Sequence, residues 1–171
     1  MTKRSAAARH LESQPDILII GAGISGLYQT YKLRELGYNV QVLEAGTGVG
    51  GTWYWNRYPG ARFDSESWSY GYSFSKELLG EWEWSEHFSA QPETLAYVNY
   101  VADKFDLKKH VTFETRVSAA RYDEASNTWT VTAEDGRQWT TRYLITGIGV
   151  LTTPVMPTIE GIADFQGESF H

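Results

Sequence analysis

The feature that most constrains the fold is a glycine pattern between a short apolar strand and a helix. Residues 16–20 read Asp-Ile-Leu-Ile-Ile, a short run that is apolar and mostly β-branched after Asp16 and is typical of a buried strand. Residues 21–26 read Gly-Ala-Gly-Ile-Ser-Gly, and apolar or aromatic residues at helical spacing follow until Gly37. Residues 38–43 then predict a second strand, which ends at Glu44. A strand, a glycine turn, a helix and a strand make a βαβ unit, which winds right-handedly into a parallel sheet.

Each glycine of this turn has a physical role in binding a dinucleotide. Gly21 allows a tight turn, and Gly23 lets the backbone approach a pyrophosphate closely. Gly26 lets the helix pack closely against the strand, while the helix N-terminus supplies amide donors and a positive dipole. The alternative is a glycine-rich turn in an unrelated α/β domain.

An acidic residue and a second glycine pair narrow the choice of cofactor. Glu44 places a carboxylate where a ribose would offer its hydroxyls. A phosphate on that ribose would meet an anion, so FAD or NAD is favoured over NADP. Gly50 and Gly51, followed by Thr52 and Trp53, add a second point of close approach and suit the large flat ring system of a flavin. We therefore interpret the cofactor as FAD.

The rest of the chain predicts a second helix and more strands. Residues 45–75 lack clear periodicity, and Pro92 opens a helix that runs to Phe105. Residues 111–113 predict a third parallel strand, and residues 143–146 predict a last buried strand.

An antiparallel meander is expected between those two strands. Its strands alternate in polarity, and Asp135-Gly136 predicts a two-residue hairpin turn. The expected strands cover residues 116–122, 128–134 and 137–142. The predicted fold is α/β: a Rossmann-like FAD-binding domain with a βαβ parallel sheet and an antiparallel β-meander, of the two-dinucleotide-binding flavoprotein type.

Composition excludes several classes of function. The 171 residues (19.4 kDa) suit one domain, and 15 basic against 21 acidic residues argue against nucleic-acid binding. Without cysteine, disulfides, thiolate metal sites and cysteine nucleophiles are excluded, and no metal site is expected. No run is long and apolar enough to span a membrane, and no signal peptide is recognisable, so we expect a cytoplasmic protein. We expect residues 1–14 to be a disordered tail and residues 15–171 to be the FAD-binding domain.

Aromatic residues are unusually frequent. The sequence holds 7 Trp, 11 Tyr and 7 Phe, and many of them lie between Trp53 and Phe88. Rings in that number form either a large core or a surface that covers a flat cofactor. The sequence alone leaves both interpretations open.

Several motifs together resemble the Baeyer–Villiger monooxygenases, a family of flavoproteins that act on cyclic, aromatic or steroid ketones. The most specific is the run of residues 50–64, Gly-Gly-Thr-Trp-Tyr-Trp-Asn-Arg-Tyr-Pro-Gly-Ala-Arg-Phe-Asp. Residues 165–171 match the first half of the family's signature, Phe-x-Gly-x-x-x-His-x-x-x-Trp-Pro. Further matches are the loop of residues 21–26, Glu44-Ala45, Glu66, Tyr70, Tyr72-Ser-Phe74, Trp82-Glu-Trp84 and Gln91-Pro92 with the helix that follows. One departure is Thr146-Gly-Ile-Gly149, where relatives often have Ala-Thr-Gly or Ala-Ser-Gly; its glycines still permit close approach to the flavin.

The resemblance implies a set of flavin contacts and one catalytic residue. Asp64 resembles the family's active-site carboxylate, which positions an arginine that supports the anionic flavin peroxide and polarises the ketone. A buried carboxylate beside a flavin needs such a partner, because an unpaired buried charge is costly; the alternative for Asp64 is a loop cap before Ser65. Val117 would hold the adenine through its backbone, and His171 would serve conformation near the region where flavin and nicotinamide meet. The implied FAD contacts are Gly21, Ala22, Gly23, Ser25, Gly26, Glu44, Gly51, Thr52, Trp53, Asp64, Tyr70 and Val117.

The activity implied by the resemblance is the NADPH- and O2-dependent oxidation of ketones to esters or lactones through a C4a-peroxyflavin. NADPH needs its own glycine loop, and Gly147-Ile-Gly149 is followed by Thr152 where a third glycine would stand. We therefore expect the NADPH site and the active-site arginine to lie in a missing C-terminal part, and the chain to be the N-terminal portion of such an enzyme, inactive alone.

Two alternatives stay open. The chain can be a stand-alone flavin-binding subunit that completes its site with a partner chain, which an exposed apolar face would mark. It can also belong to another class B-type flavin monooxygenase, such as an N-hydroxylating enzyme. The arrangement of Tyr58, Pro59, Gly60 and Asp64 argues against that second alternative.

Overall fold

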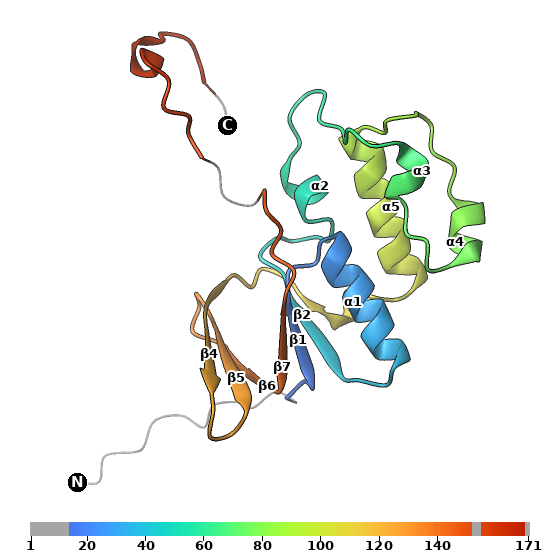
Figure 1. Ribbon diagram of the computed structural model, residues 1–171, viewed down its shortest axis with the longest axis vertical. Coiled ribbons are helices and arrows are strands. Elements are labelled where there is room, and N and C mark those ends of the chain that lie inside the picture. The colour runs from blue at the N-terminus through green and yellow to red at the C-terminus, as the bar shows by residue number, and fades with distance from the viewer. Residues whose placement is uncertain (1–13, 152–154, 170–171) are drawn as a thin grey trace.

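A four-stranded parallel sheet forms the centre of the protein (Figure 1). The computed structural model describes residues 14–151 and 155–169, so the predicted tail, apart from Gln14, and His171 lie outside the described residues. The strands follow the order β3-β2-β1-β7, and all neighbours pair in parallel. Their bounds are β1 Ile17–Ile20, β2 Val40–Leu43, β3 Val111–Thr112 and β7 Tyr143–Thr146. The predicted βαβ unit and the third parallel strand are confirmed.

The first helix, α1 (Ile24–Glu35), ends where the sequence predicts. Gly37 has a φ of 86°, a left-handed conformation that glycine adopts without strain. Its N–H donates to the carbonyl of Arg34, and the N–H of Tyr38 donates to the carbonyl of Leu33. This pair of bonds is a Schellman motif, which satisfies carbonyls that the helix end would leave free.

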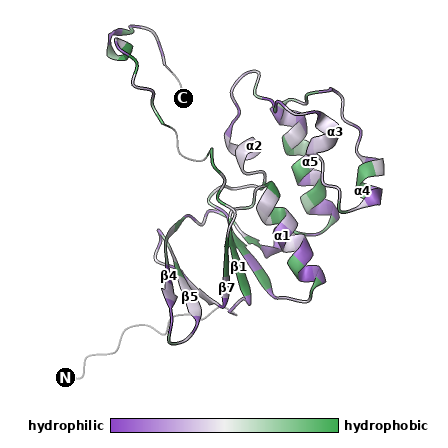
Figure 2. Ribbon diagram, viewed as in Figure 1, coloured by the Kyte–Doolittle hydropathy of each residue, from purple (hydrophilic) through white to green (hydrophobic). Residues whose placement is uncertain are grey.

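Helices cover one face of the parallel sheet, and a second sheet covers the other (Figure 1). Side chains of β1 alternate between the two faces: Ile17 and Ile19 pack with the helices, and Leu18 packs with the second sheet. Figure 2 shows β1 and β7 as strongly hydrophobic strands. The helices beyond α1 are α2 Thr52–Trp55, α3 Ser67–Tyr70, α4 Lys76–Glu81 and α5 Gln91–Lys104, followed by the 3-10 turn η1 Lys108–His110.

The second sheet is the predicted antiparallel meander. Its strands are β4 Val117–Asp123, β5 Thr128–Ala133 and β6 Gln138–Thr141, in that order. The two-residue turn predicted at Asp135-Gly136 is wrong by one residue, because Ala133 and Arg137 close a loop of three residues. Gly136 has a φ of 86° and occupies the left-handed position of that loop.

The last parallel strand is less buried than predicted. Leu144 and Ile145 of β7 are only half-buried, and Tyr143 and Thr146 are exposed. The reason is the position of β7 at the edge of the sheet, where it pairs with β1 alone. Beyond it, all described residues from 155 to 169, including the 3-10 turn η2 (Ile162–Asp164), are exposed. No helix in the described part of the chain is long and apolar enough to cross a membrane.

Candidate functional site

Three glycine segments from distant parts of the chain meet at the carboxyl end of β1. The N–H of Gly21 donates to the carbonyl of Leu43, 2.8 Å away, at the end of β2. The N–H of Gly50 donates to the carbonyl of Ala22 at 3.0 Å, and the N–H of Gly147 donates to the carbonyl of Ile20 at 2.8 Å. The loop predicted to bind a pyrophosphate is therefore held by backbone bonds on both sides.

We call these three segments, residues 21–26, 50–51 and 147, the glycine cradle. Glycine is required in this cradle because backbone atoms occupy the space that a side chain would need. A Cβ on Gly26 would stand 1.9 Å from the carbonyl oxygen of Gly21, and a Cβ on Gly21 would stand 2.5 Å from the carbonyl oxygen of Gly147. A Cβ on Gly51 would stand 2.8 Å from the Cα of Gly23. The structure therefore gives Gly147 a role that the sequence did not show, which is close packing against the turn at Gly21.

The N-terminus of α1 opens onto this cradle. Gly23 is the N-cap residue, and no side chain caps the helix there. The first turn contains no acidic residue, and the side chain of Ser25 is exposed. Uncapped N–H groups and the positive end of the helix dipole favour an anion such as a diphosphate.

Glu44 is buried beside the loop, with 4% of its surface exposed. Its Oε2 accepts a 2.7 Å bond from the N–H of Ala22, and its Oε1 accepts a 2.7 Å bond from the N–H of Gly46. Each oxygen of an ionised carboxylate has a second lone pair. Glu44 therefore both fixes the turn and retains the capacity to accept a bond from a ribose hydroxyl.

Trp53 follows the second glycine pair and lies in an aromatic cluster. Its indole Nε1 donates to the hydroxyl of Tyr70 at 2.8 Å, and Phe63 stacks on Tyr70 with ring centroids 4.3 Å apart. Burial raises the pKa of the Tyr70 phenol, so it stays neutral. Gln91 donates from its side-chain amide to the Trp53 carbonyl, a buried contact to which the sequence gave no signal beyond the resemblance at Gln91-Pro92.

Comparisons with known proteins agree with this geometry. Residues 19–73 match the family model described as an NAD(P)-binding Rossmann-like domain. The 2-oxo-Delta(3)-4,5,5-trimethylcyclopentenylacetyl-CoA monooxygenase of Pseudomonas putida is 52% identical over 91% of this chain and 29% of that protein. A Baeyer–Villiger monooxygenase of Pseudooceanicola batsensis is 46% identical over 91% of this chain and 29% of that protein.

A solved structure extends the match to the fold. The crystal structure of OTEMO in complex with FAD and NADP matches with a TM-score of 0.84 and 51% identity, over 94% of this chain and 30% of that one. This chain corresponds to the N-terminal part of Baeyer–Villiger monooxygenases. It spans about 30% of the length of the relatives that it matches.

The residue that resembles the catalytic carboxylate of Baeyer–Villiger monooxygenases lies outside the glycine cradle. Asp64 is exposed, and its carboxylate has no hydrogen-bonding or ionic partner among residues 14–151 and 155–169. The expectation of a buried carboxylate is therefore wrong for this chain by itself, because none of its described segments covers the loop at Asp64. The proposed loop-capping contact is not made either.

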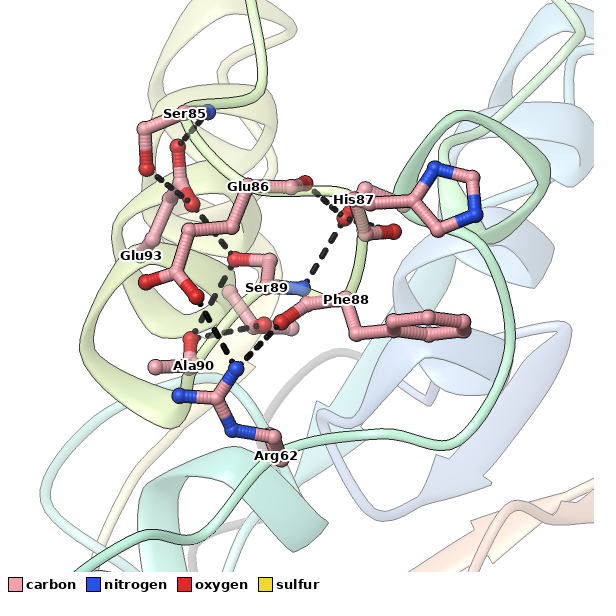
Figure 3. Close-up of polar contacts among 10 residues, drawn as sticks. Arg62, Ser85, Glu86, His87, Phe88, Ser89, Ala90 and Glu93 are labelled. Carbon is pink, nitrogen blue, oxygen red and sulfur yellow. Dashed lines mark hydrogen bonds and ion pairs between the residues drawn. The ribbon is translucent and has the colours of Figure 1, made fainter.

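The loop that carries Asp64 is nevertheless anchored by hydrogen bonds at both ends, and Figure 3 shows the end at Arg62. On one side, Arg62 donates from Nη1 to Glu86 Oε2 and to the Phe88 carbonyl, both at 2.9 Å. On the other side, the Ser67 hydroxyl donates to the carbonyl of Glu86 at 2.7 Å and accepts from the N–H of Ser89 at 2.9 Å. Two anchored ends restrict where the Asp64 carboxylate can lie.

Val117, the residue that resembles the adenine contact of Baeyer–Villiger monooxygenases, is the first residue of β4. The segment just before it is tied to the acidic residue, because the N–H of Thr115 donates to the carbonyl of Glu44 at 2.8 Å. The pairing of β4 with β5 is irregular between Val117 and Ala119, which interrupts the ladder at that point. The structure therefore brings Val117 to the same end of the parallel sheet as Glu44.

Replacing Glu44 with Gln is expected to destabilise the chain by about 1–3 kcal/mol. One oxygen becomes an amide nitrogen, which cannot accept from the N–H of Ala22 or Gly46, so one buried donor is left without an acceptor. Urea unfolding measures the change. The control is Glu114→Gln, which alters an exposed side chain nearby and is expected to stay within about 0.5 kcal/mol. Equal stability of the two variants would contradict this role of Glu44.

Proposed function

We propose that this chain binds FAD and forms the flavin-binding part of a Baeyer–Villiger monooxygenase. The observation that carries the proposal is the glycine cradle, in which Gly21, Gly26 and Gly51 leave no room for a Cβ beside an uncapped helix N-terminus. A cradle of this kind admits a diphosphate against the backbone, and Glu44 stands ready for a ribose. The residues present therefore fit the cofactor.

Each site residue has a defined task in this proposal. The loop of Gly21, Ala22, Gly23, Ser25 and Gly26 holds the diphosphate through its N–H groups. Glu44 accepts from the adenosine ribose, and the Val117 backbone holds the adenine. Gly51, Thr52 and Trp53 cover the diphosphate and flavin, with Tyr70 fixing the Trp53 indole. When bound, FAD supplies the oxygen-activating chemistry.

Asp64 is the catalytic residue of the proposal. Its carboxylate holds the guanidinium of an arginine from outside this chain, and that cation polarises the ketone oxygen and stabilises negative charge at the flavin. NADPH and O2 are the co-substrates, and the products are esters or lactones. The NADPH site belongs to the C-terminal part of the enzyme, or to a partner chain. The exposed apolar side chains of Val150, Leu151, Val155, Ile159 and Phe165 suit contact with that part. The cytoplasmic location stays a prediction.

The purified chain is expected to bind one equivalent of FAD. FAD is expected to bind more tightly than FMN, because FMN lacks the adenosine half that Glu44 and Val117 would hold. It is also expected to bind more tightly than NADP, whose ribose phosphate would meet the Glu44 carboxylate. Equilibrium dialysis measures all three affinities, with flavin absorbance as the readout for FAD and FMN and adenine absorbance as the readout for NADP. A chain that binds FMN as tightly as FAD would contradict the proposed site.

The reaction itself is tested in the product of the complete reading frame that encodes this sequence. With NADPH and a panel of cyclic, aromatic and steroid ketones, isotopically labelled O2 is expected to deliver one labelled oxygen atom into an ester or lactone. N-oxides or sulfoxides formed in place of esters would instead indicate another kind of flavin monooxygenase. Activity that requires a second protein would indicate the stand-alone flavin-binding subunit.

A further inference from the structure

The aromatic cluster forms a continuous path from the glycine cradle to the surface. It starts at Trp53, which lies two residues after Gly51. Phe63 contacts the indole of Trp53 with ring centroids 5.6 Å apart. Phe63 then contacts Trp84 at 6.1 Å, and Trp84 contacts Trp82 at 5.8 Å. Trp82 contacts Tyr100 on α5 at 5.5 Å. Indole and phenol rings are the side chains that lose an electron most readily, and the rate of electron transfer between them falls steeply as their separation grows.

The last ring of this path has a proton acceptor at the surface. The hydroxyl of Tyr100 donates to Oε2 of Glu81, an exposed residue at the end of α4. Lys104 lies 2.8 Å from the same carboxylate, and this contact lowers the pKa of Glu81, so Glu81 remains ionised. A phenol that loses an electron must lose its proton as well, and Glu81 can take that proton.

Trp82, the indole that contacts Tyr100, lacks a proton acceptor of this kind within the described part of the chain. Nε1 of Trp82 is buried and has no hydrogen-bond partner among residues 14–151 and 155–169. An oxidised indole without an acceptor for its N–H proton stays a radical cation, which is a strong oxidant. Trp82 is therefore suited to pass its oxidising equivalent on, and Tyr100 is suited to keep it.

We propose that Trp53, Trp84, Trp82 and Tyr100 form a relay that carries oxidising equivalents from the flavin site to the protein surface. This inference rests on the proposed binding of FAD beside Trp53. Trp82, Trp84 and Tyr100 also pack against the hydrophobic core. Packing alone would be served equally well by Phe and Leu, so the relay gives a reason for Trp and Tyr at these positions. Phe63, which is hard to oxidise, serves as a bridge that touches both indoles.

The electrons balance along the path. A one-electron oxidant at the flavin site would take one electron from Trp53 and keep it; oxidised FAD, if bound there and excited by light, would supply such an oxidant. Trp84 then reduces Trp53, Trp82 reduces Trp84, and Tyr100 reduces Trp82. The phenol proton of Tyr100 passes to Glu81, which leaves a neutral tyrosyl radical at the surface. A soluble one-electron reductant of the ascorbate class then reduces the tyrosyl radical, and the proton returns from Glu81, so that the net transfer is one electron from that reductant to the oxidant at the flavin site.

Flash photolysis of the FAD-loaded chain tests the relay, with transient absorption as the readout. After a light pulse, the tryptophan radical signal is expected to decay as the sharp absorption of the neutral tyrosyl radical appears. Tyr100→Phe is expected to abolish the tyrosyl signal and to leave a long-lived tryptophan radical. Trp84→Phe is expected to remove the tyrosyl signal and to confine the oxidation to Trp53, which mass spectrometry after prolonged illumination would detect as oxidised Trp53.

The matched control is Tyr31→Phe. Tyr31 also donates its hydroxyl to a carboxylate, Glu35, at 2.7 Å, but its ring contacts are Phe74 and Phe105, outside the path. This variant is expected to give the same signals as the unchanged chain. A tyrosyl signal that survives in Tyr100→Phe or Trp84→Phe, or bound FAD with no radical beyond Trp53, would overturn the relay alone. Failure to bind FAD would overturn the proposed function and the relay with it.

Discussion

Gly26→Ala is expected to abolish FAD binding and to cost about 3 kcal/mol or more in the free energy of unfolding. The new Cβ would stand 1.9 Å from the carbonyl oxygen of Gly21 and 3.7 Å from a side-chain atom of Ile19. The clash is with backbone, which cannot rotate away, so α1 would have to move from the end of β1. That movement displaces the uncapped N–H groups from the diphosphate position.

The control for this substitution is Gly80→Ala. Gly80 also lies in a helix, α4, but it is exposed, and a Cβ there would meet nothing within 4 Å. Alanine is the better helix former, so this variant is expected to gain about 0.5–1 kcal/mol and to bind FAD unchanged. Chemical unfolding and equilibrium dialysis measure both variants. If Gly26→Ala bound FAD like the unchanged chain, close packing of helix and strand would not be needed for the site.

The sequence predicted those parts of the fold that depend on local patterns. The apolar run before Gly21 and the glycine at the end of α1 have direct conformational meaning, so β1, α1 and β2 were predicted almost to the residue. Solvent exposure was harder to predict, because it depends on which other elements pack against a helix or strand. The strand at 143–146 is apolar in sequence, but it is half-exposed because it lies at the edge of the sheet. Helix α4 has six residues, too few to show a helical period.

The candidate site also has some features that the sequence predicted and others that it did not. The roles of Gly21, Gly23 and Gly26 follow from the motif, because each reflects the space that a Cβ would fill. The packing of Gly147 on Gly21 joins residues more than a hundred positions apart, and no spacing rule predicts it. The exposure of Asp64 depends in turn on which segments pack against its loop, so neither the motif nor the charge could show it.

In the complete monooxygenase that we propose, Asp64→Asn is expected to lower the rate of ester formation by about 10²–10³, the loss typical for a removed electrostatic contact in a catalytic site. The neutral amide keeps the shape of the side chain but cannot hold a guanidinium by charge. Asp64 is exposed and makes no polar contact within the described part of this chain, so the free energy of unfolding of the chain is expected to change by less than about 0.5 kcal/mol. FAD binding is expected to persist.

This combination separates catalysis from folding. The measurements are FAD occupancy and urea unfolding of the chain, and NADPH consumption and ester yield of the complete enzyme. Glu83→Gln removes another exposed acidic charge and is the control, with no expected change in any of them. An Asp64→Asn enzyme that forms ester at the unchanged rate would remove Asp64 from the mechanism. A variant that loses FAD as well would make Asp64 a binding residue. Loss of FAD through unfolding is not expected, because Asp64 is exposed and its replacement leaves the core intact.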